Sequence, residues 1–244
     1  MSKQLVIIPT YNEKENIEAI IRKVLLLHRP FDILIVEDNS PDGTALIVKR
    51  LQQELGGRLA MLERKGKLGL GTAYIAGFRW GLEQGYDYIC EMDADFSHNP
   101  DDLPRLLEAC EQGADLAVGS RYVSGVNVVN WPMKRVLISY YGSAYVRKIL
   151  NIRVRDMTAG FKCYRRKTLE AICFDNIKMK GYGFQIEMKY TAMKLGFHLV
   201  EVPIIFTDRK LGSTKMSGGI VREALLGILK LRFKNIAKTH STQL

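Results

Sequence analysis

The sequence predicts a single α/β domain built on a mostly parallel sheet, and three observations lead to this fold class. Its 244 residues are 47% hydrophobic and 25% charged, which are ordinary values for a folded globular chain. Short apolar runs alternate with amphipathic segments of about 10 to 15 residues, as in β-α-β units. The longest stretch without a charge, residues 122–133, is far shorter than the roughly 20 apolar residues that a spanning helix needs. Low-complexity, collagen-like and membrane-spanning classes are therefore excluded.

Strands and helices alternate from residue 4 to about residue 118. Gln4–Ile8 is a short apolar run that ends at Pro9, which indicates a buried strand. Asn12 can cap the next helix, with Glu15 three residues on as in a capping box, and apolar residues at helical spacing extend this helix to Leu25. Further apolar runs predict strands at Phe31–Val36, Leu59–Leu62, Tyr86–Met92 and Leu116–Val118, and the segments between them predict helices over 44–55, over 72–84 and from Asn99 onward.

The second half is less regular. We expect a helix over 132–150, strands at Phe161–Tyr164 and Leu199–Phe206, a helix over 184–195 between them, and a last helix over Gly219–Lys238. In this last helix Ile220, Ala224, Ile228 and Leu231 share one stripe, and basic residues crowd its final turns. No Pro- or Ser-rich linker marks a boundary, so we expect one domain with an elaborated C-terminal part.

Polar clusters follow four of the predicted strands. They lie at Thr10–Glu13, Glu37–Asp42, Asp93–Asp95 and Ser120–Arg121. In open parallel sheets, ligands bind outside the carboxyl ends of the strands. We therefore expect one site at this edge of the sheet.

The two halves of the chain differ in charge. Residues 1–120 hold 13 basic and 19 acidic residues, a net charge of −6, whereas residues 121–244 hold 23 basic and 7 acidic residues, a net charge of +16. Such asymmetry indicates an anionic partner for the second half, which could be nucleic acid, a membrane surface or a phosphorylated substrate. Simple solvation of the surface is the alternative. The four cysteines form no CxxC pair, so we expect neither disulfides nor zinc, as in a reducing cytoplasm.

Asp93-Ala94-Asp95 is the strongest candidate for a metal site. Two carboxylates two residues apart at a strand end can converge on one Mg²⁺ or Mn²⁺ ion, which would bridge nucleotide phosphates. His98, close behind, is expected to be a turn residue and not a ligand. Glu37 and Asp38 could accept hydrogen bonds from a base or ribose, while helix capping by Ser40 and Asp42 is the alternative.

Basic groups supply candidates for phosphate binding. Residues 64–72, rich in Gly, Lys and Arg, are either a phosphate cradle or a mobile loop, and they do not form a P-loop. Arg121, Arg135, Arg209 and Lys215 lie in Gly-, Ser- and Tyr-rich surroundings, and Arg suits phosphate because its planar fork donates two hydrogen bonds. The Gly-x-Ser-x-Gly, His-Glu-x-x-His and Gly-x-Gly-x-x-Gly motifs are absent.

Several segments together resemble a known family. Residues 6–13 (VIIPTYNE), 35–44 (IVEDNSPDGT) and 92–98 (MDADFSH) are similar to those of the inverting GT-A glycosyltransferases. Residues 66–73 (GKLGLGTA), 119–122 (GSRY) and Asp208-Arg209 with Lys215 narrow the resemblance to the dolichyl-phosphate (polyprenyl-phosphate) mannosyltransferases, the dolichol-phosphate-mannose synthase family. It implies a GT-A (Rossmann-like) fold, with residues 1–215 as the catalytic domain and residues 216–244 as a C-terminal amphipathic, basic helix and tail.

The resemblance also implies residue roles. Pro9, Tyr11, Glu13, Val36 and Asp38 would hold the guanosine of GDP-mannose. Asp93, Ala94 and Asp95 would hold the diphosphate and Mg²⁺ or Mn²⁺, with Asp93 and Asp95 as metal ligands. Arg121, Arg209 and Lys215 would contact the donor, and Arg121, Arg135 and Ser139 the acceptor phosphate. Asp95, Arg121, Arg209 and Lys215 are thereby the expected catalytic residues. Gln185 and Glu187 match a family motif without an implied role.

Many such relatives carry C-terminal transmembrane helices, and this chain resembles the type without them. We therefore expect peripheral attachment at the cytoplasmic face of a bacterial inner membrane or the ER. The attachment would use a small membrane subunit or the Gly219–Lys238 helix lying on lipid, whose basic residues suit anionic headgroups. Packing of this helix on the domain is the alternative.

The resemblance implies transfer of mannose from GDP-mannose to a polyprenyl or dolichyl phosphate with inversion. Two other transferases stay open: one that uses another donor, such as UDP-glucose, and one that extends a saccharide. The second usually has a QxxRW-like motif, and no Arg-Trp pair occurs here. We expect no nucleic-acid partner, because the chain lacks the interleaved aromatic and basic residues of a known module.

Overall fold

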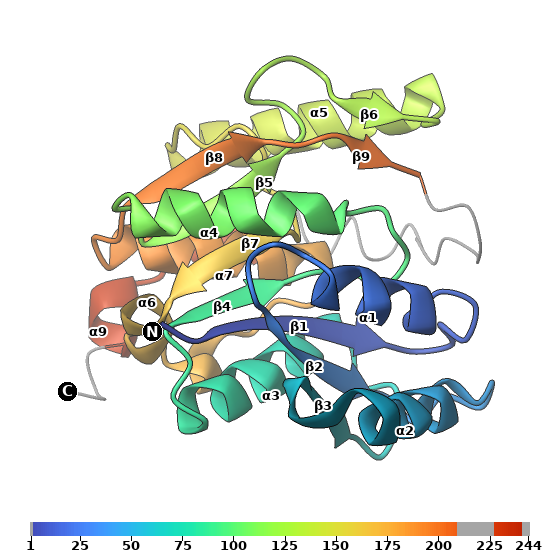
Figure 1. Cartoon of the computed structure of the whole chain (residues 1–244). Coiled ribbons are helices and arrows are strands. Elements are labelled where there is room, and N and C mark those ends of the chain that lie inside the picture. Colours follow the sequence, from blue (N-terminus) through green and yellow to red (C-terminus); the bar gives the residue numbers. More distant parts are fainter. Residues whose placement is uncertain (1, 209–226, 241–244) are drawn as a thin grey trace.

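The computed structural model describes residues 2–208 and 227–240, and its central feature is a seven-stranded sheet (Figure 1). Its strands, in spatial order, are β3 (Leu59–Glu63), β2 (Asp32–Glu37), β1 (Gln4–Thr10), β4 (Tyr88–Glu91), β7 (Lys162–Arg165), β5 (Leu116–Ser120) and β8 (Leu199–Pro203). Neighbouring strands pair in parallel, except that β7 runs antiparallel to both β4 and β5. The predicted mostly parallel sheet is therefore confirmed.

Helices cover both faces of the sheet. On one face lie α1 (Ile17–Leu25), α2 (Thr44–Leu55) and α4 (Leu103–Glu111), and on the other α3 (Leu70–Glu83), α6 (Arg166–Glu170) and α7 (Tyr182–Lys194). Side chains of β1 alternate between the two cores, Val6 and Ile8 toward α1 and Leu5 and Ile7 toward α3. Burial on both faces explains why the parallel strands read as continuous apolar runs. Short 3₁₀ turns lie at Gly56–Arg58, Pro100–Asp102 and Phe174–Asn176.

Two glycines let α3 lie close to the sheet. A Cβ at Gly77 would come within 2.7 Å of Ile7 Cγ2, and one at Gly81 within 2.9 Å of side-chain carbons of Leu5 and Ile89. The two positions are four residues apart, so they share one face of the helix. This close packing holds the start of α3, near Gly69 and Leu70, beside the carboxyl ends of the strands.

Two local expectations were wrong. The first helix begins at Ile17, not directly after Asn12, and its N-cap Asn16 makes no side-chain capping bond; Asn12 instead adopts a left-handed conformation with φ of 58°. The predicted strand 199–206 divides into β8 and the two-residue β9 (Phe206–Thr207). β9 leaves the main sheet and pairs in parallel with β6 (Val128–Val129). The chain at Ile204-Ile205 thus crosses from the sheet to the edge of the site.

The C-terminal segment packs on the domain where the structure describes it. Residues 227–233 are helical, and α9 (Ile236–His240) follows after a break at residues 234–235. Ile228, Leu231 and Ile236 share a buried cluster with residues of α7 and of α5 (Met133–Leu150). Lys234 pairs with Glu187 of α7 at 3.0 Å. Ile220 and Ala224 of the predicted stripe lie outside the described residues. None of the described helices has both the length and the apolar character that crossing a membrane requires.

Candidate active site

A cavity of about 520 Å³ opens at the carboxyl ends of β1, β2, β4 and β5, where the polar clusters were expected. Its lining includes nine of the predicted site residues: Pro9, Tyr11, Glu13, Asp38, Asp93, Ala94, Asp95, Arg121 and Arg135. Val36 and Ser139 are not part of the lining, because the Val36 side chain lies in the core and Ser139 accepts a hydrogen bond from Tyr122. Arg209 and Lys215 lie outside the described residues.

The loop after β1 is held by side chains of the loop after β2. The backbone N–H groups of Asn12, Glu13 and Lys14 donate to Ser40 Oγ, Thr44 Oγ1 and Asp42 Oδ2 at 3.0, 3.1 and 3.0 Å. Asp42 also accepts from the Thr44 N–H, but the N-cap of α2 is Gly43, without a side-chain capping bond, and Ser40 accepts from Asn12, so the expected helix capping by Ser40 and Asp42 is wrong. Glu37 turns back to accept from the N–H groups of Asn39 and Ser40 and does not line the cavity. Of the two acidic residues after β2, Asp38 is therefore the one that can meet a ligand.

Asp38 is fixed by a bidentate ion pair with Arg64. Arg64 Nε donates to Asp38 Oδ1 at 2.6 Å and Nη2 donates to Oδ2 at 2.8 Å. Nη1 of Arg64 reaches Thr72 Oγ1 at 2.8 Å, which ties the pair to the first turn of α3. Lys67, further along the same loop, lies 4.7 Å from the centre of the Tyr11 ring. Lys67, Gly69 and Leu70 of this segment line the cavity, together with the residues expected to hold the nucleoside.

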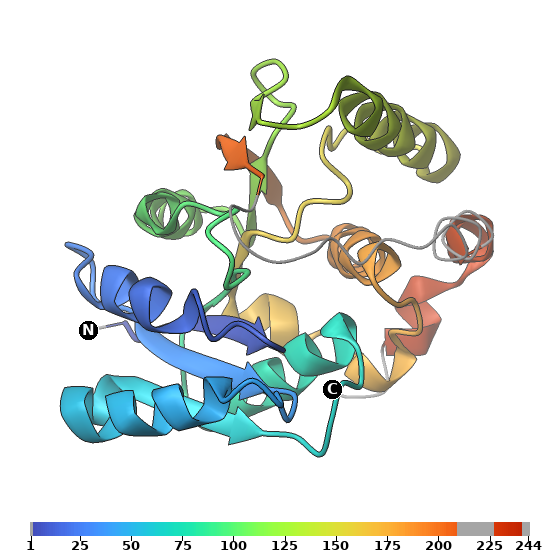
Figure 2. The ribbon, with the colours of Figure 1, turned by 90° about the vertical axis from the view of Figure 1, so that its right-hand side faces the viewer.

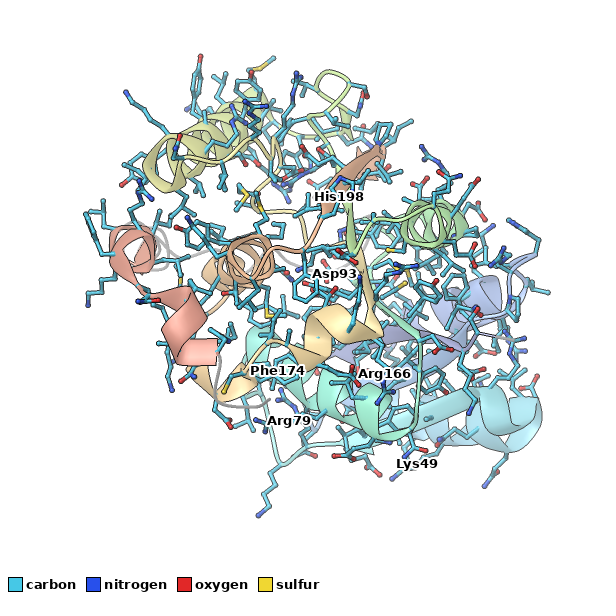
Figure 3. The ribbon with its side chains drawn as sticks, turned by 90° about the vertical axis from the view of Figure 1, so that its left-hand side faces the viewer. Lys49, Arg79, Asp93, Arg166, Phe174 and His198 are labelled. Carbon is cyan, nitrogen blue, oxygen red and sulfur yellow. The ribbon has the colours of Figure 1, made fainter. Side chains whose placement is uncertain are left out.

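Asp93, Ala94 and Asp95 follow β4 directly. The Asp93 N–H donates to His98 Nδ1 at 3.2 Å, Asp95 Oδ1 accepts from the Ser97 N–H at 3.1 Å, and Phe96 between them is left-handed. The buried His98 ring stacks on Phe161 with centroids 4.9 Å apart. His98 therefore belongs to the turn, as expected, and also packs in the wall of the cavity. Figure 3 shows Asp93 near the centre of the view, whereas Lys49 and Arg79 lie nearer its lower edge.

These two carboxylates fit a divalent cation. Partial burial, opposed by the nearby His98 and reinforced by the negative charge of Asp95, raises the pKa of Asp93 above its ordinary value. A cation between the two would remove this penalty. No group of three or more His, Cys, Asp or Glu residues that could enclose a metal occurs in the described part of the chain. Two carboxylates, with substrate phosphates and water completing the shell, are the usual arrangement for Mg²⁺.

Arginines form the opposite side of the cavity. Arg121, directly after β5, is buried and pairs with Asp156 through two hydrogen bonds of 2.6 Å. Arg135, on α5, pairs with Asp208 at 2.8 Å and lies 4.1 Å over the centre of the Trp131 ring. Although burial opposes the charge, Asp156 raises the pKa of Arg121 above its ordinary value. Both guanidinium groups are therefore held in place by carboxylates before any ligand binds.

The structure adds residues that the sequence did not indicate. Thr158, Trp131, Tyr182 and Phe206 line the cavity, and none of them follows a predicted strand or belongs to a catalytic motif. Gln185 also lines it, and its amide is fixed from below: Nε2 donates to Glu91 at 2.9 Å, and the amide oxygen accepts from Lys162. Lys162 and Glu91 are fully buried and pair at 2.9 Å. Of these residues, only Gln185 carried a sequence signal, its match to a family motif, whereas Thr158 and Trp131 lie in loops and Phe206 in β9.

Comparison with known proteins gives the class of protein. The chain is similar to solved structures of glucosyl-3-phosphoglycerate synthase from Mycobacterium tuberculosis. The complex with Mn²⁺, UDP-glucose and phosphoglyceric acid superposes with a TM-score of 0.68, at 17% identity, over 95% of this chain and 80% of the other. The complex with Mg²⁺ and UDP gives the same score at 18% identity over 94% and 79%. At this identity they show the fold, which is the GT-A fold of nucleotide-sugar glycosyltransferases.

The family follows from the sequence comparison. The glycosyl transferase family 2 model matches residues 5–173, and the chain belongs to that family. It is similar to the polyprenol monophosphomannose synthase of Mycolicibacterium smegmatis, with 48% identity over 93% of this chain and 85% of the relative. It is also similar to the undecaprenyl-phosphate mannosyltransferase of Micrococcus luteus, with 50% identity over 93% and 92%. The predicted family, fold and enzyme class are therefore confirmed.

Proposed function

We propose that this enzyme transfers mannose from GDP-mannose to a polyprenyl (dolichyl) monophosphate with inversion, which gives a polyprenyl-phosphate β-mannose. The names of the two relatives support the acceptor and the sugar. The observation that carries the proposal is that one cavity is lined both by the carboxylates of Asp93 and Asp95 and by the guanidinium groups of Arg121 and Arg135. A reaction between two anions needs such a site, because each anion must meet its own counter-charge.

The acceptor does not need a strong general base. The second pKa of a phosphate monoester lies near 6, so the lipid phosphate is mostly a dianion at neutral pH. Its oxygen can attack the anomeric carbon from the side opposite the diphosphate, which turns an α-linked donor into a β-linked product. Arg121 and Arg135 would bind and orient this phosphate through directed hydrogen bonds.

The donor would lie across the ends of β1, β2 and β4. Pro9, Tyr11, Glu13 and Asp38 would hold the guanosine, and a contact from Val36 would have to come from its main chain, since its side chain lies in the core. Asp93 and Asp95 would hold Mg²⁺ or Mn²⁺, which, when bound, neutralises the departing diphosphate. Arg209 and Lys215 stay predicted donor contacts.

We infer that the acceptor is presented from a membrane surface. In the first half of α5 the apolar side chains Met133, Leu137, Ile138 and Tyr141 are exposed, with 63% of Ile138 accessible, and the exposed Lys134 lies among them. This stretch includes Arg135, so the apolar surface adjoins the expected phosphate-binding group. The helix at 227–233, whose outer face carries Lys230, Arg232 and the exposed Phe233, lies on the same side of the molecule (Figure 2). Apolar side chains with flanking cations suit an anionic bilayer. A small anchoring subunit and the cytoplasmic face remain predictions.

The decisive experiment is transfer of labelled mannose. Purified enzyme is incubated with radiolabelled GDP-mannose, a polyprenyl phosphate in detergent and Mg²⁺, and the lipid is extracted and counted. We expect label in the lipid fraction, lost with EDTA and without acceptor. Labelled UDP-glucose, tested in parallel, covers the alternative donor. Equal or greater transfer from UDP-glucose, or no labelled lipid at all, would refute the proposal.

A further inference from the structure

Arg121 uses only part of its guanidinium on the protein. Nε–H donates to Asp156 Oδ2 at 2.6 Å, and the Nη2 group donates to Asp156 Oδ1 at 2.6 Å and to Thr158 Oγ1 at 2.7 Å. A guanidinium has five N–H groups, and these bonds use three. The remaining two are on Nη1, and no residue in the described ranges accepts them. Because Arg121 lines the cavity, Nη1 is the edge available to a ligand.

The surroundings prevent the guanidinium from turning. The Arg121 and Asp156 side chains are 7% and 0% exposed. The rings of Tyr122, Trp131 and Phe206 lie 5.2 to 5.5 Å from the guanidinium carbon. Cations over aromatic faces are attracted to them, so the rings add to the restraint. The direction of the Nη1 edge is therefore set by the carboxylate on the opposite side.

Asp156 is itself fixed, and its carboxylate is fully committed. Oδ2 also accepts the main-chain N–H of Arg121 at 3.0 Å, while the N–H groups of Arg155 and Asp156 donate to Glu201 of β8 at 2.7 and 2.9 Å. Although burial opposes ionisation, the charge of Arg121 holds the pKa of Asp156 below its ordinary value. A carboxylate in this state does not take up a proton at neutral pH.

We propose that Asp156, with Thr158, is the positioning residue that turns the Nη1 edge of Arg121 toward the substrate phosphates, and that Asp156 is not a general base. The inference rests on the proposed function, which supplies those phosphates. Because Asp156 neutralises much of the Arg121 charge, Arg121 contributes directed hydrogen bonds more than a diffuse attraction for anions. The phosphate must then lie where Nη1 points, which fixes its angle relative to the donor.

Three substitutions test this role. Asp156→Asn removes the charge and one of the oxygen acceptors, Thr158→Val removes one acceptor while leaving the ion pair, and Asp156→Glu restores the charge. Asp115→Asn is the matched control: Asp115 is a buried aspartate that accepts the His198 N–H, and it precedes β5 at the end of the strand opposite Arg121. Thermal unfolding of all four variants separates loss of fold from loss of function, and Thr158→Val keeps the test valid if Asp156→Asn does not fold.

Arg121 is also a predicted donor contact, so titration with GDP and with guanosine measures how strongly the site binds the donor phosphates. Losing a group that orients a ligand-binding side chain costs about 10- to 100-fold. We expect Asp156→Asn to weaken GDP binding by at least about tenfold. Thr158→Val should weaken GDP binding by about fivefold, the effect of one hydrogen bond. Guanosine affinity should stay the same in both. Equal loss for GDP and guanosine, or no loss in either variant, would overturn the inference.

Kinetics then separate positioning from base catalysis. We expect Asp156→Asn and Thr158→Val to raise KM for polyprenyl phosphate, Asp156→Glu to recover part of the loss, and the pH profile of kcat to keep its shape. If Asp156→Asn instead abolished the acid limb of kcat at unchanged KM, Asp156 would be a base and the inference would be wrong. A different result is possible: the wild-type protein transfers no mannose, but both variants bind GDP more weakly and guanosine as before. That result would refute the proposed function and leave the role of Asp156 supported.

Discussion

Replacing Arg64 with methionine removes the guanidinium that holds Asp38 while keeping a side chain of similar length. The two side chains are 10% and 8% exposed, and they share bonds of 2.6 and 2.8 Å. Breaking a buried ion pair by removing one partner costs about 3–5 kcal/mol. Because Asp38 lines an open cavity, we take the lower limit, about 3 kcal/mol. For a chain of this size that lowers the melting temperature by roughly 6–12 °C.

The functional effect is expected at the nucleoside. If Asp38 contacts the guanosine, a less well oriented Asp38 weakens the binding of guanosine and of GDP by the same factor, about tenfold or 1.4 kcal/mol. This differs from the variants of Asp156, which should affect only the phosphate-bearing ligand. Thr72→Val is the control, because it removes one hydrogen bond from Arg64 and leaves the ion pair intact. Calorimetric titration of both ligands measures the effect. Arg64→Met protein that binds guanosine as tightly as wild type would show that Asp38 does not act on the nucleoside.

Three further predictions concern the metal, the membrane and the packing of α3. Asp95→Ala should reduce mannose transfer by at least about 100-fold at saturating Mg²⁺. The control Asp101→Asn, which changes a surface ion pair with Lys23, should leave transfer unchanged. Full activity of Asp95→Ala would exclude Asp95 as a metal ligand. The double variant Leu137→Glu/Ile138→Glu should weaken binding to phosphatidylcholine–phosphatidylglycerol vesicles, measured by sedimentation, by more than about tenfold. The control Leu46→Glu, at a residue on α2 that is 71% exposed, should leave vesicle binding unchanged. Equal effects would place the membrane contact elsewhere. Gly77→Ala should lower the free energy of unfolding by about 1 kcal/mol net, because crowding against Ile7 exceeds the gain in helix propensity. Gly142→Ala on α5, with open space around it, should raise the free energy of unfolding by up to about 1 kcal/mol. Urea unfolding that changes the stability of both variants in the same direction would contradict this.

Much of the fold could be read from the sequence, because its parallel strands are buried on both faces. The strands in the first half stand out as apolar runs, and the residues after them mark the cavity. The orientation of β7 could not be read in this way. Its four residues include Lys162, which is buried only because Glu91 and Gln185 meet it from other elements. Residues far apart in sequence supply these partners, and no local pattern encodes them.

The site was predicted where residues follow strands or match motifs, and missed where spatial contact alone defines the role. Arg121 could be named from its place after β5. Asp156 and Thr158 could not, because they lie in a loop and act through a residue 35 and 37 positions away, respectively. Val36 is a different case: its place in a family motif implies a ligand contact, but its alternation along β2 puts the side chain in the core, so only its main chain is left for that contact.

The two-residue strand β9 touches both ends of the site. The Thr207 N–H donates to the carbonyl of Ser97, in the turn after Asp95, and the next residue, Asp208, accepts from Arg135. Main-chain bonds to Asn127 and Val129 fix this short segment from the other side. The spacing between the expected metal turn and the expected acceptor arginine is therefore set by rigid backbone. If these groups bind the two substrates as expected, their spacing is set by the fold before either substrate arrives, and binding would itself help to align the pair.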